Sequence, residues 1–174
     1  TFEGRRVDFL VSVLPTVRGE TASVRLLDGD GLGQSLESLG FEKDNARDFR
    51  EALAKGAGML LAAGPSGSGR TATLHAALRE APRAEGGVYT VEDPVERRID
   101  WAHQVAADEA RGPTFAAALR SVLRHDPEVI LVGDIRDSET AALAAEAALA
   151  GRLVLAAIRA AAAADAVARL GGLG

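Results

Sequence analysis

The sequence predicts an α/β fold with a mostly parallel sheet, preceded by the end of a small β-containing domain. Three features indicate this fold. From residue 58 onward, short apolar runs alternate with helical patterns, and a glycine-rich segment joins the first such run to the helix that follows it. The first 27 residues are instead rich in β-forming residues. Continuous apolar strands that alternate with helices are typical of parallel sheets covered on both faces.

The composition is that of a globular domain with a small flanking piece. Of the 174 residues, 47% are hydrophobic and 26% are charged, which argues against disorder. The net charge of −5 argues against a nucleic-acid partner, which usually selects a basic surface. The absence of cysteine excludes disulfides and thiolate zinc sites and favours an intracellular protein. No signal peptide or membrane-spanning run is recognisable. Because the sequence starts at Thr1 without Met, we expect a piece of a longer protein.

Residues 1–28 are expected to be the end of an N-terminal domain. Residues 7–14 and 21–27 are β-rich, with a turn expected between them. The run Asp28-Gly29-Asp30-Gly31 breaks this pattern, so residues 29–57 are assigned to a linker and a helix.

The helix in that segment is expected near residues 43–55. Asp44 is the expected N-cap, and Gly56 is expected to follow the C-terminus. Apolar residues recur at helical spacing on one face, which consists of Ala46, Phe49, Ala52 and Leu53.

Residues 58–174 are assigned to the α/β domain, whose C-terminal part we expect to be missing. The apolar runs that predict its strands are 58–63, 88–91, 129–132 and 153–158. The helical stretches between and after them are 70–81, 114–125, 138–150 and 162–170. The alanine-rich tract at 160–164 is interpreted as part of a helix, because alanine has the highest helix propensity.

A candidate phosphate-binding loop follows the first predicted strand of this domain. Its residues are Gly64-Pro65-Ser66-Gly67-Ser68-Gly69-Arg70-Thr71. They match G-x-x-x-x-G-K-[ST], except that Arg70 replaces Lys, and the strand–loop–helix context suits such a loop. Glycines let backbone N–H groups surround an anion, and the helix N-terminus adds positive charge. Thr71 would offer its hydroxyl to Mg²⁺. The alternative is a glycine-rich turn with no ligand.

Acidic residues follow two other predicted strands. Glu92 is the candidate general base, with Glu96 in reserve, whereas Asp93 is equally suited to holding the turn. Asp134 ends an apolar strand and is the candidate Mg²⁺ ligand, directly or through water. The alternative for the first segment is a solvated acidic turn.

The residues after Asp134 favour a structural interpretation. Asp137 or Ser138 would cap the next helix, and Arg136 and Glu139 suit surface pairing.

Histidines and large aromatic residues do not indicate a further site. The scattered His75, His103 and His125 fit no metal-ligand spacing, so a structural or surface role is expected. Tyr89 and Trp101 are expected to pack in the core or at a domain interface.

These segments together resemble the type II secretion and type IV pilus assembly ATPase family over nearly the whole chain. The phosphate loop resembles its Walker A motif, residues 90–96 its Asp box, and residues 132–141 its Walker B motif. The helix at 114–124 with Asp126-Pro127, and the segments 14–20 and 25–28, also match. A generic phosphate-loop protein would share only the first of these motifs.

The resemblance implies a RecA-like P-loop NTPase core after a PAS-like N-terminal domain. It implies ATP and Mg²⁺ as cofactors, and Thr73 and Arg25 as further nucleotide-binding residues. It also implies a homo-hexamer in the cytoplasm, peripheral to the inner membrane. Its partners would be an inner-membrane platform protein and an adaptor of the N-terminal domain, and ATP hydrolysis would move pilin or pseudopilin subunits.

Several positions depart from the family pattern. Arg70 replaces the Walker A Lys, Asp134 replaces a Glu, and Arg152 and Arg159 replace the two histidines of the His box. Further departures are Leu10, in place of an Arg, and Ala160, Ala161 and Ala162, in place of polar residues.

This altered set predicts slow or absent hydrolysis, although the arginines retain positive charge for phosphate. The chain is then either an ATP-hydrolysing motor subunit with impaired turnover or a pseudo-ATPase with a structural or regulatory role in the same ring. A phosphate-loop enzyme of another class, such as a small-molecule kinase, is disfavoured by the additional motifs.

Overall fold

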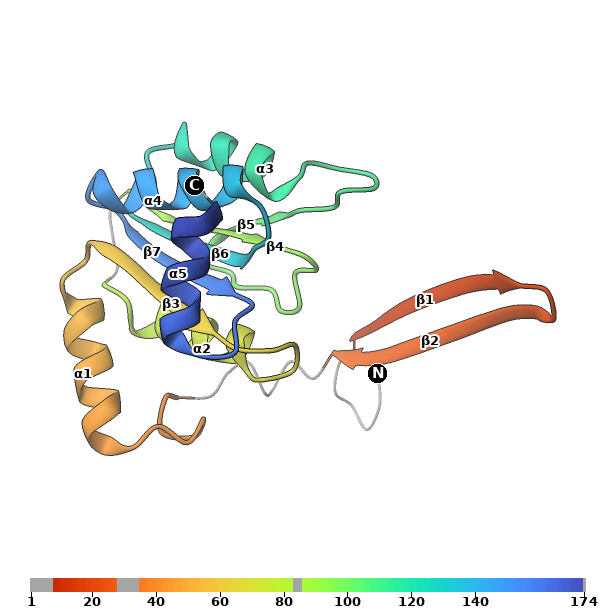
Figure 1. Ribbon diagram of the computed structural model, residues 1–174, viewed down its shortest axis with the longest axis horizontal. Helices are drawn as coiled ribbons and strands as arrows, with labels where there is room; N and C mark the ends of the chain where they lie inside the picture. The colour runs from red at the N-terminus through yellow and green to blue at the C-terminus, as the bar shows by residue number, and fades with distance from the viewer. Residues whose placement is uncertain (1–7, 28–34, 83–85, 174) are drawn as a thin grey trace.

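The computed structural model describes residues 8–27, 35–82 and 86–173, which form a hairpin and an α/β body (Figure 1). The hairpin pairs β1 (Asp8–Thr16) with β2 (Gly19–Leu27) in antiparallel orientation. Among the described residues, the body has a five-stranded sheet of order β3-β7-β6-β4-β5, in which all neighbouring strands are parallel. The predicted α/β fold with a parallel sheet is therefore confirmed.

The elements of the body alternate as the sequence predicts. Each predicted apolar run becomes a strand, and a helix lies between successive strands except at β5. In chain order the elements are α1 (Lys43–Ala54), β3 (Gly58–Ala63), α2 (Arg70–Glu80), β4 (Val88–Glu92), β5 (His103–Ala106), α3 (Phe115–Leu123), β6 (Val129–Ile135), α4 (Ser138–Leu149), β7 (Leu153–Ile158) and α5 (Ala163–Leu173).

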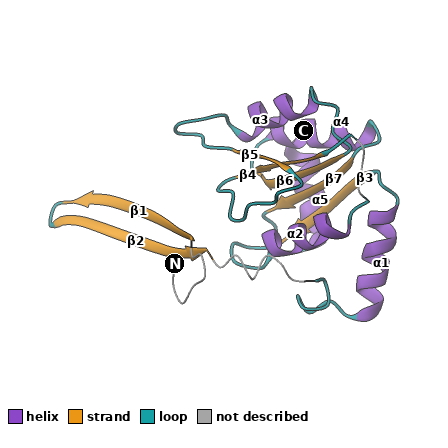
Figure 2. Cartoon of the chain, turned by 180° about the vertical axis from the view of Figure 1, so that it is seen from behind, coloured by secondary structure: helices purple, strands orange, loops and turns teal. Residues whose placement is uncertain are grey.

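Helices cover both faces of the sheet, so its central strands are apolar on both sides. In β6, Ile130 and Val132 pack against the side of α3 and α4, whereas Val129 and Leu131 pack against the side of α1 and α2. Figure 2 shows these two pairs of helices on opposite sides of the sheet. Side chains alternate between faces along a strand, so both faces of β6 must be apolar.

The hairpin strands extend further than predicted. β1 runs to Thr16 and β2 starts at Gly19, so the connection is shorter than the sequence suggests. The Thr16 hydroxyl donates to the Gly19 carbonyl at 2.7 Å, and Gly19 adopts a φ of 112°. Pro15 fits inside β1 because both strands of an isolated hairpin are edge strands, where a missing N–H is tolerated.

One face of the hairpin is apolar and open. Phe9, Val11 and Val13 alternate along β1 and are paired across the hairpin with Leu26, Val24 and Ala22. Phe9 is 55% exposed and Leu26 is 56% exposed. In Figure 1 the hairpin projects away from the body. A two-stranded hairpin is only marginally stable by itself in water. The exposed apolar face shows that the other described residues do not cover and stabilise it.

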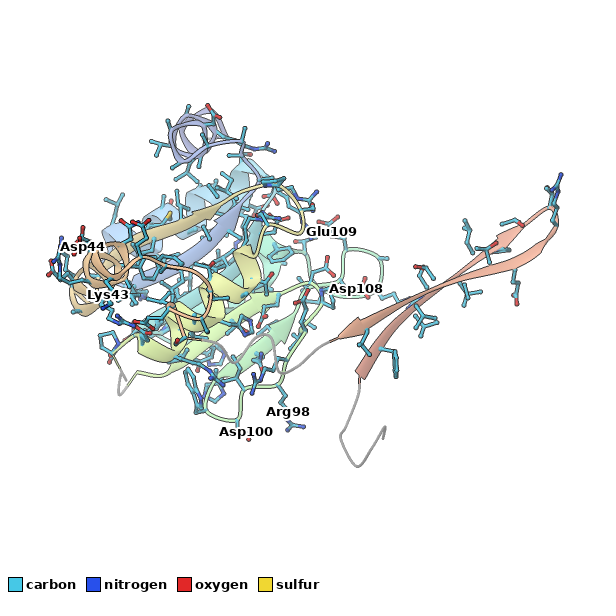
Figure 3. The ribbon with its side chains drawn as sticks, turned by 90° about the horizontal axis from the view of Figure 1, so that it is seen from below. Lys43, Asp44, Arg98, Asp100, Asp108 and Glu109 are labelled. Atoms are coloured by element: carbon cyan, nitrogen blue, oxygen red, sulfur yellow. The ribbon has the colours of Figure 1, made fainter. Side chains whose placement is uncertain are left out.

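Two local features differ from the sequence prediction. β5 was not expected, because its residues are partly polar and it lies at the sheet edge. Asp44 lies in the first turn of α1 (Figure 3), and Glu42 occupies the N-cap without a side-chain bond. An acidic group there still stabilises the positive helix end. Trp101 is 45% exposed, so of the two alternatives expected for it the core is excluded and packing at a domain interface stays a prediction.

Other local predictions are confirmed. Gly56 follows the C-cap of α1 with a φ of 64°, and Asp137 caps α4 by accepting a hydrogen bond from the Thr140 N–H at 2.7 Å. The predicted break at residues 28–31 lies outside the described residues. Among the described residues, no helix is both long and apolar enough to cross a membrane.

The central position of β6 makes a test of the fold possible. Leu131 is 1% exposed, so Leu131→Ala should lower the free energy of unfolding by about 2–5 kcal/mol through lost burial and a cavity. Leu149 on α4 is 88% exposed, and Leu149→Ala should change it by no more than about 0.5 kcal/mol. Urea denaturation measures both values, and equal effects would contradict the described packing.

Candidate functional site

The candidate site lies at the carboxyl edge of the parallel sheet. The phosphate loop, residues 64–69, joins the end of β3 to the start of α2. Glu92 is the last residue of β4, Asp134 lies near the end of β6, and Arg159 directly follows β7. Carboxyl ends of parallel strands share one edge, which is where ligands bind in open α/β sheets.

The loop has the backbone geometry that its glycines permit. Gly67 and Gly69 have φ values of 80° and 89°, and Gly69 is the N-cap of α2. A Cβ on Gly64 would lie 2.3 Å from the Ser68 Oγ, so the start of the loop is closely packed. Residues 65–69 are exposed. The loop and the N-terminus of α2 therefore present N–H groups and positive potential to a ligand.

Asp134 is the centre of an ion cluster beside this loop. Its Oδ1 accepts a hydrogen bond from Arg70 at 3.1 Å, and its Oδ2 accepts from Arg136 at 3.0 Å and from Arg159 at 3.2 Å. The Asp134 side chain is 7% exposed. Burial of a carboxylate is costly unless it is paired, and these guanidinium groups supply the pairing.

Arg136 links this cluster to two further acids. Its guanidinium bonds Asp93 at 3.1 Å and lies 3.9 Å from Glu109, which is labelled in Figure 3 in the loop before α3. It also lies over the Phe115 ring, 5.0 Å from the centroid. Burial lowers the pKa of Arg136, but its bonds to Asp134 and Asp93 outweigh this and raise it. Arg136 is exposed and paired with acids, as the sequence interpretation expects, and this pairing also connects it to Asp134.

Glu92 is held in a separate buried network. Its Oε2 lies 2.8 Å from His75 Nε2, and its Oε1 accepts from Thr90 at 2.6 Å and from Gln104 at 3.1 Å. Burial raises the pKa of Glu92, but the bonds from His75, Thr90 and Gln104 outweigh it and hold the pKa below its ordinary value. Of the structural or surface role expected for His75, the surface alternative is wrong, since His75 is 2% exposed on α2.

Gly133 lets the two acid-bearing strands approach closely. A Cβ at this position would lie 3.1 Å from the Val91 carbonyl oxygen and 3.3 Å from Glu92 Cα. No role is predicted for this glycine from the sequence. Its position inside a strand, just before Asp134, could have indicated the role, because glycine inside a strand often marks a place where another backbone approaches closely.

Two of the expected site residues lie elsewhere. Arg152 precedes β7, at its opposite end from Arg159, about 23 Å away at about 3.3 Å per residue. It donates to the Pro127 carbonyl at 3.1 Å and pairs with Asp126 at 2.9 Å. The interpretation of Arg152 as a phosphate-facing residue is therefore wrong.

Glu96 lies in a different environment from Glu92. It lines a groove of about 810 Å³ beside β5 and α3, together with Tyr89, His103 and His125. The ring of Tyr89 stacks on both histidines, at centroid distances of 4.7 and 5.8 Å.

Thr71 and Thr73 are half-buried in the first turn of α2, whereas the side chain of Arg25 lies outside the described part of the structure.

Comparison with known proteins identifies the family. The family model for type II/IV secretion system proteins matches residues 1–174. The chain belongs to this family. It is 42% identical over 171 residues to the type II secretion system ATPase E of Vibrio cholerae, covering 98% of this chain and 34% of that protein. It is 45% identical over 152 residues to the type IV pilus assembly ATPase PilB of Myxococcus xanthus, covering 87% of this chain and 27% of the relative.

Solved structures of secretion and pilus ATPases share the fold. The ATPase DotB of Legionella pneumophila superposes with a TM-score of 0.75 at 25% identity, over 99% of this chain and 48% of that one. The pilus retraction motor PilT with bound ADP also gives 0.75, at 28% identity, over 95% of this chain and 48% of that one. The chain spans about a third of the length of its curated relatives. The RecA-like P-loop assignment agrees with these neighbours.

The carboxylates of the site are already engaged by protein groups. Among the described residues, no three His, Cys, Asp or Glu side chains are grouped as a metal site. Mg²⁺ in phosphate-transfer sites is usually bound through one or two carboxylates with water and substrate phosphates rather than by an all-protein cage. Both oxygens of Asp134 accept bonds from guanidinium groups, and both oxygens of Glu92 are bonded to His75 on α2 and to Thr90 on β4. Thr71 and Asp134 as Mg²⁺ ligands stay a prediction, and a cation at Asp134 would have to displace a guanidinium group.

The Glu92 network predicts a specific pH dependence of stability. Because the folded-state pKa lies below the ordinary value of 4.5, the unfolded chain binds the proton first as pH falls. The stabilisation is complete above about pH 4.5 and is lost as pH falls through the folded-state pKa. Glu92→Gln should cost about 1–3 kcal/mol at neutral pH, because buried hydrogen-bond partners lose a charged acceptor.

Urea denaturation between pH 7 and pH 3 measures this effect. The difference in unfolding free energy between the unaltered chain and Glu92→Gln should shrink as pH falls. Glu146 on α4 is exposed, and Glu146→Gln should show no such convergence. A pH-independent penalty for Glu92→Gln would contradict the described network.

Proposed function

We propose that this chain is the nucleotide-binding part of a secretion or pilus assembly ATPase, and that it binds ATP but hydrolyses it slowly. The phosphate loop at the carboxyl edge of the sheet carries this proposal, because its glycines and the α2 N-terminus create an anion site. The ADP bound to the structural relative PilT supports a nucleotide as ligand.

Slow hydrolysis follows from the state of the acidic groups. A general base needs an accessible, properly placed oxygen. Glu92 is 3% exposed, and its oxygens are bonded to His75, Thr90 and Gln104. Asp134 is bound by guanidinium groups on both oxygens. Neither Glu92 nor Asp134 is placed to activate water, so we assign them positioning roles, and Glu96 lines another groove.

The wider role is proposed from the family. In the full-length protein, residues 1–28 would end an N-terminal domain, with residues 29–57 as linker and helix and residues 58–174 as the start of the ATPase domain. The open apolar face of β1 and β2 supports the first assignment, because it suits a larger sheet or core.

We further propose a cytoplasmic homo-hexamer at the inner-membrane face. It would act with a membrane platform protein and an N-terminal-domain adaptor to move pilin or pseudopilin subunits. If turnover is absent, the chain would serve as a pseudo-ATPase with a structural or regulatory role in that ring.

Titration with a fluorescent ATP analogue, followed by a phosphate-release assay, tests the proposal. Binding should be saturable. Release should be slower than about 0.1 per second, because typical enzymes turn over at about 10 per second and loss of one electrostatic contact costs about two to three orders of magnitude. Arg70→Lys should retain binding, and Arg47→Lys on exposed α1 is the matched control.

The outcomes separate the alternatives. Absence of binding would reject the nucleotide site. Faster release by the unaltered chain would show that the arginine cluster permits hydrolysis. Release that appears only in Arg70→Lys would mean that hydrolysis is silenced mainly at the phosphate loop.

A further inference from the structure

Two of the three cations around Asp134 stand at positions that differ from the family pattern. Arg70 opens α2, Arg159 follows β7, and Asp134 itself replaces a glutamate. Of the two His-box positions, Arg159 belongs to this group and Arg152 lies away from it. Three altered positions, Arg70, Asp134 and Arg159, therefore form one arrangement.

The cluster pairs three guanidinium groups with three carboxylates. Arg136 is shared between Asp134 and Asp93, and it also lies near Glu109. Arg70 and Arg159 each form an ion pair with Asp134 among the described residues. Asp134 is thus the carboxylate that holds both Arg70 and Arg159 beside the phosphate loop.

The guanidinium groups occupy both oxygens of Asp134, which a divalent cation bound there would need. A Mg²⁺ ion beside Asp134 would lie among guanidinium groups of the same sign, whose repulsion is strong in a partly buried site. A triphosphate would instead be attracted by them. Guanidinium groups match phosphate oxygens with paired, charge-assisted hydrogen bonds.

We propose that the site binds the triphosphate of a nucleotide without a divalent cation, with Arg70 and Arg159 in place of Mg²⁺. In the free chain Asp134 holds both guanidinium groups, and the ligand's phosphate oxygens compete with it for them. Arg159 is suited to this exchange because its side chain is 54% exposed, whereas that of Arg70 is 13% exposed at the base of the loop. The inference rests on the proposed nucleotide site.

Affinity for ATP measured by isothermal titration calorimetry in Mg²⁺ and in excess EDTA tests this inference. The dissociation constant should change by less than about threefold between the two buffers, because no protein ligand depends on the metal. Arg159→Ala should weaken binding in EDTA by about 10- to 100-fold, the loss expected for one charge-assisted hydrogen bond.

A double variant with the family's residues makes the test sharper. In Arg70→Lys with Arg159→His, compact or neutral groups replace both guanidinium groups, so binding should require Mg²⁺ again and fall at least about tenfold in EDTA. Arg152→His is the matched control: it removes a guanidinium at the opposite end of β7 and should leave the response to Mg²⁺ unchanged. Thermal melting of each variant verifies that it is folded.

Three results distinguish this inference from the proposed function. Equal binding in both buffers supports it. Binding by the unaltered chain only with Mg²⁺ would overturn it and leave the nucleotide site intact. Binding in neither buffer would overturn both.

Discussion

The Asp134 carboxylate holds the carboxyl edge of the sheet together. It is buried, and its bonds reach Arg70 at the start of α2, Arg136 beyond β6 and Arg159 beyond β7. The phosphate loop, β6 and β7 are thereby tied through one charged group. Removal of a partner from a buried ion pair typically costs about 3–5 kcal/mol. The geometry of the loop consequently depends on this cluster as well as on its glycines.

The fold was largely predictable because its strands have an unusual composition. Strands buried on both faces are continuously apolar, and β6 and β7 are almost fully buried. β5 was missed because it is short, lies at the edge and contains His103 and Gln104, so no apolar run marks it. Gln104 contributes to the site, since its side-chain amide donates a hydrogen bond to Glu92 on the neighbouring strand β4. The same polar side chain removes the apolar pattern by which this strand could have been predicted.

The candidate site was predictable in position and less so in its contacts. Strand ends alone place the loop, Glu92 and Asp134 on one edge. Arg152 and Arg159 flank the same predicted strand, and the predicted parallel sheet already places only Arg159 at the carboxyl edge with the loop. Arg136 had a detectable signal. It lies two residues after Asp134, and residues at that spacing in extended backbone point to the same side.

The cluster explains how family membership and a degraded motif coexist. Transition-state stabilisation requires groups that bind the reacting phosphate more strongly as charge develops, and a base that can accept a proton. Guanidinium groups that attract phosphate oxygens equally in the bound and reacting states increase affinity without increasing rate. Glu92 is locked by His75 and Thr90 and adds no free base. These contacts are the basis of our proposal that the site retains the anion-binding half of the family's chemistry and loses much of the half that drives hydrolysis.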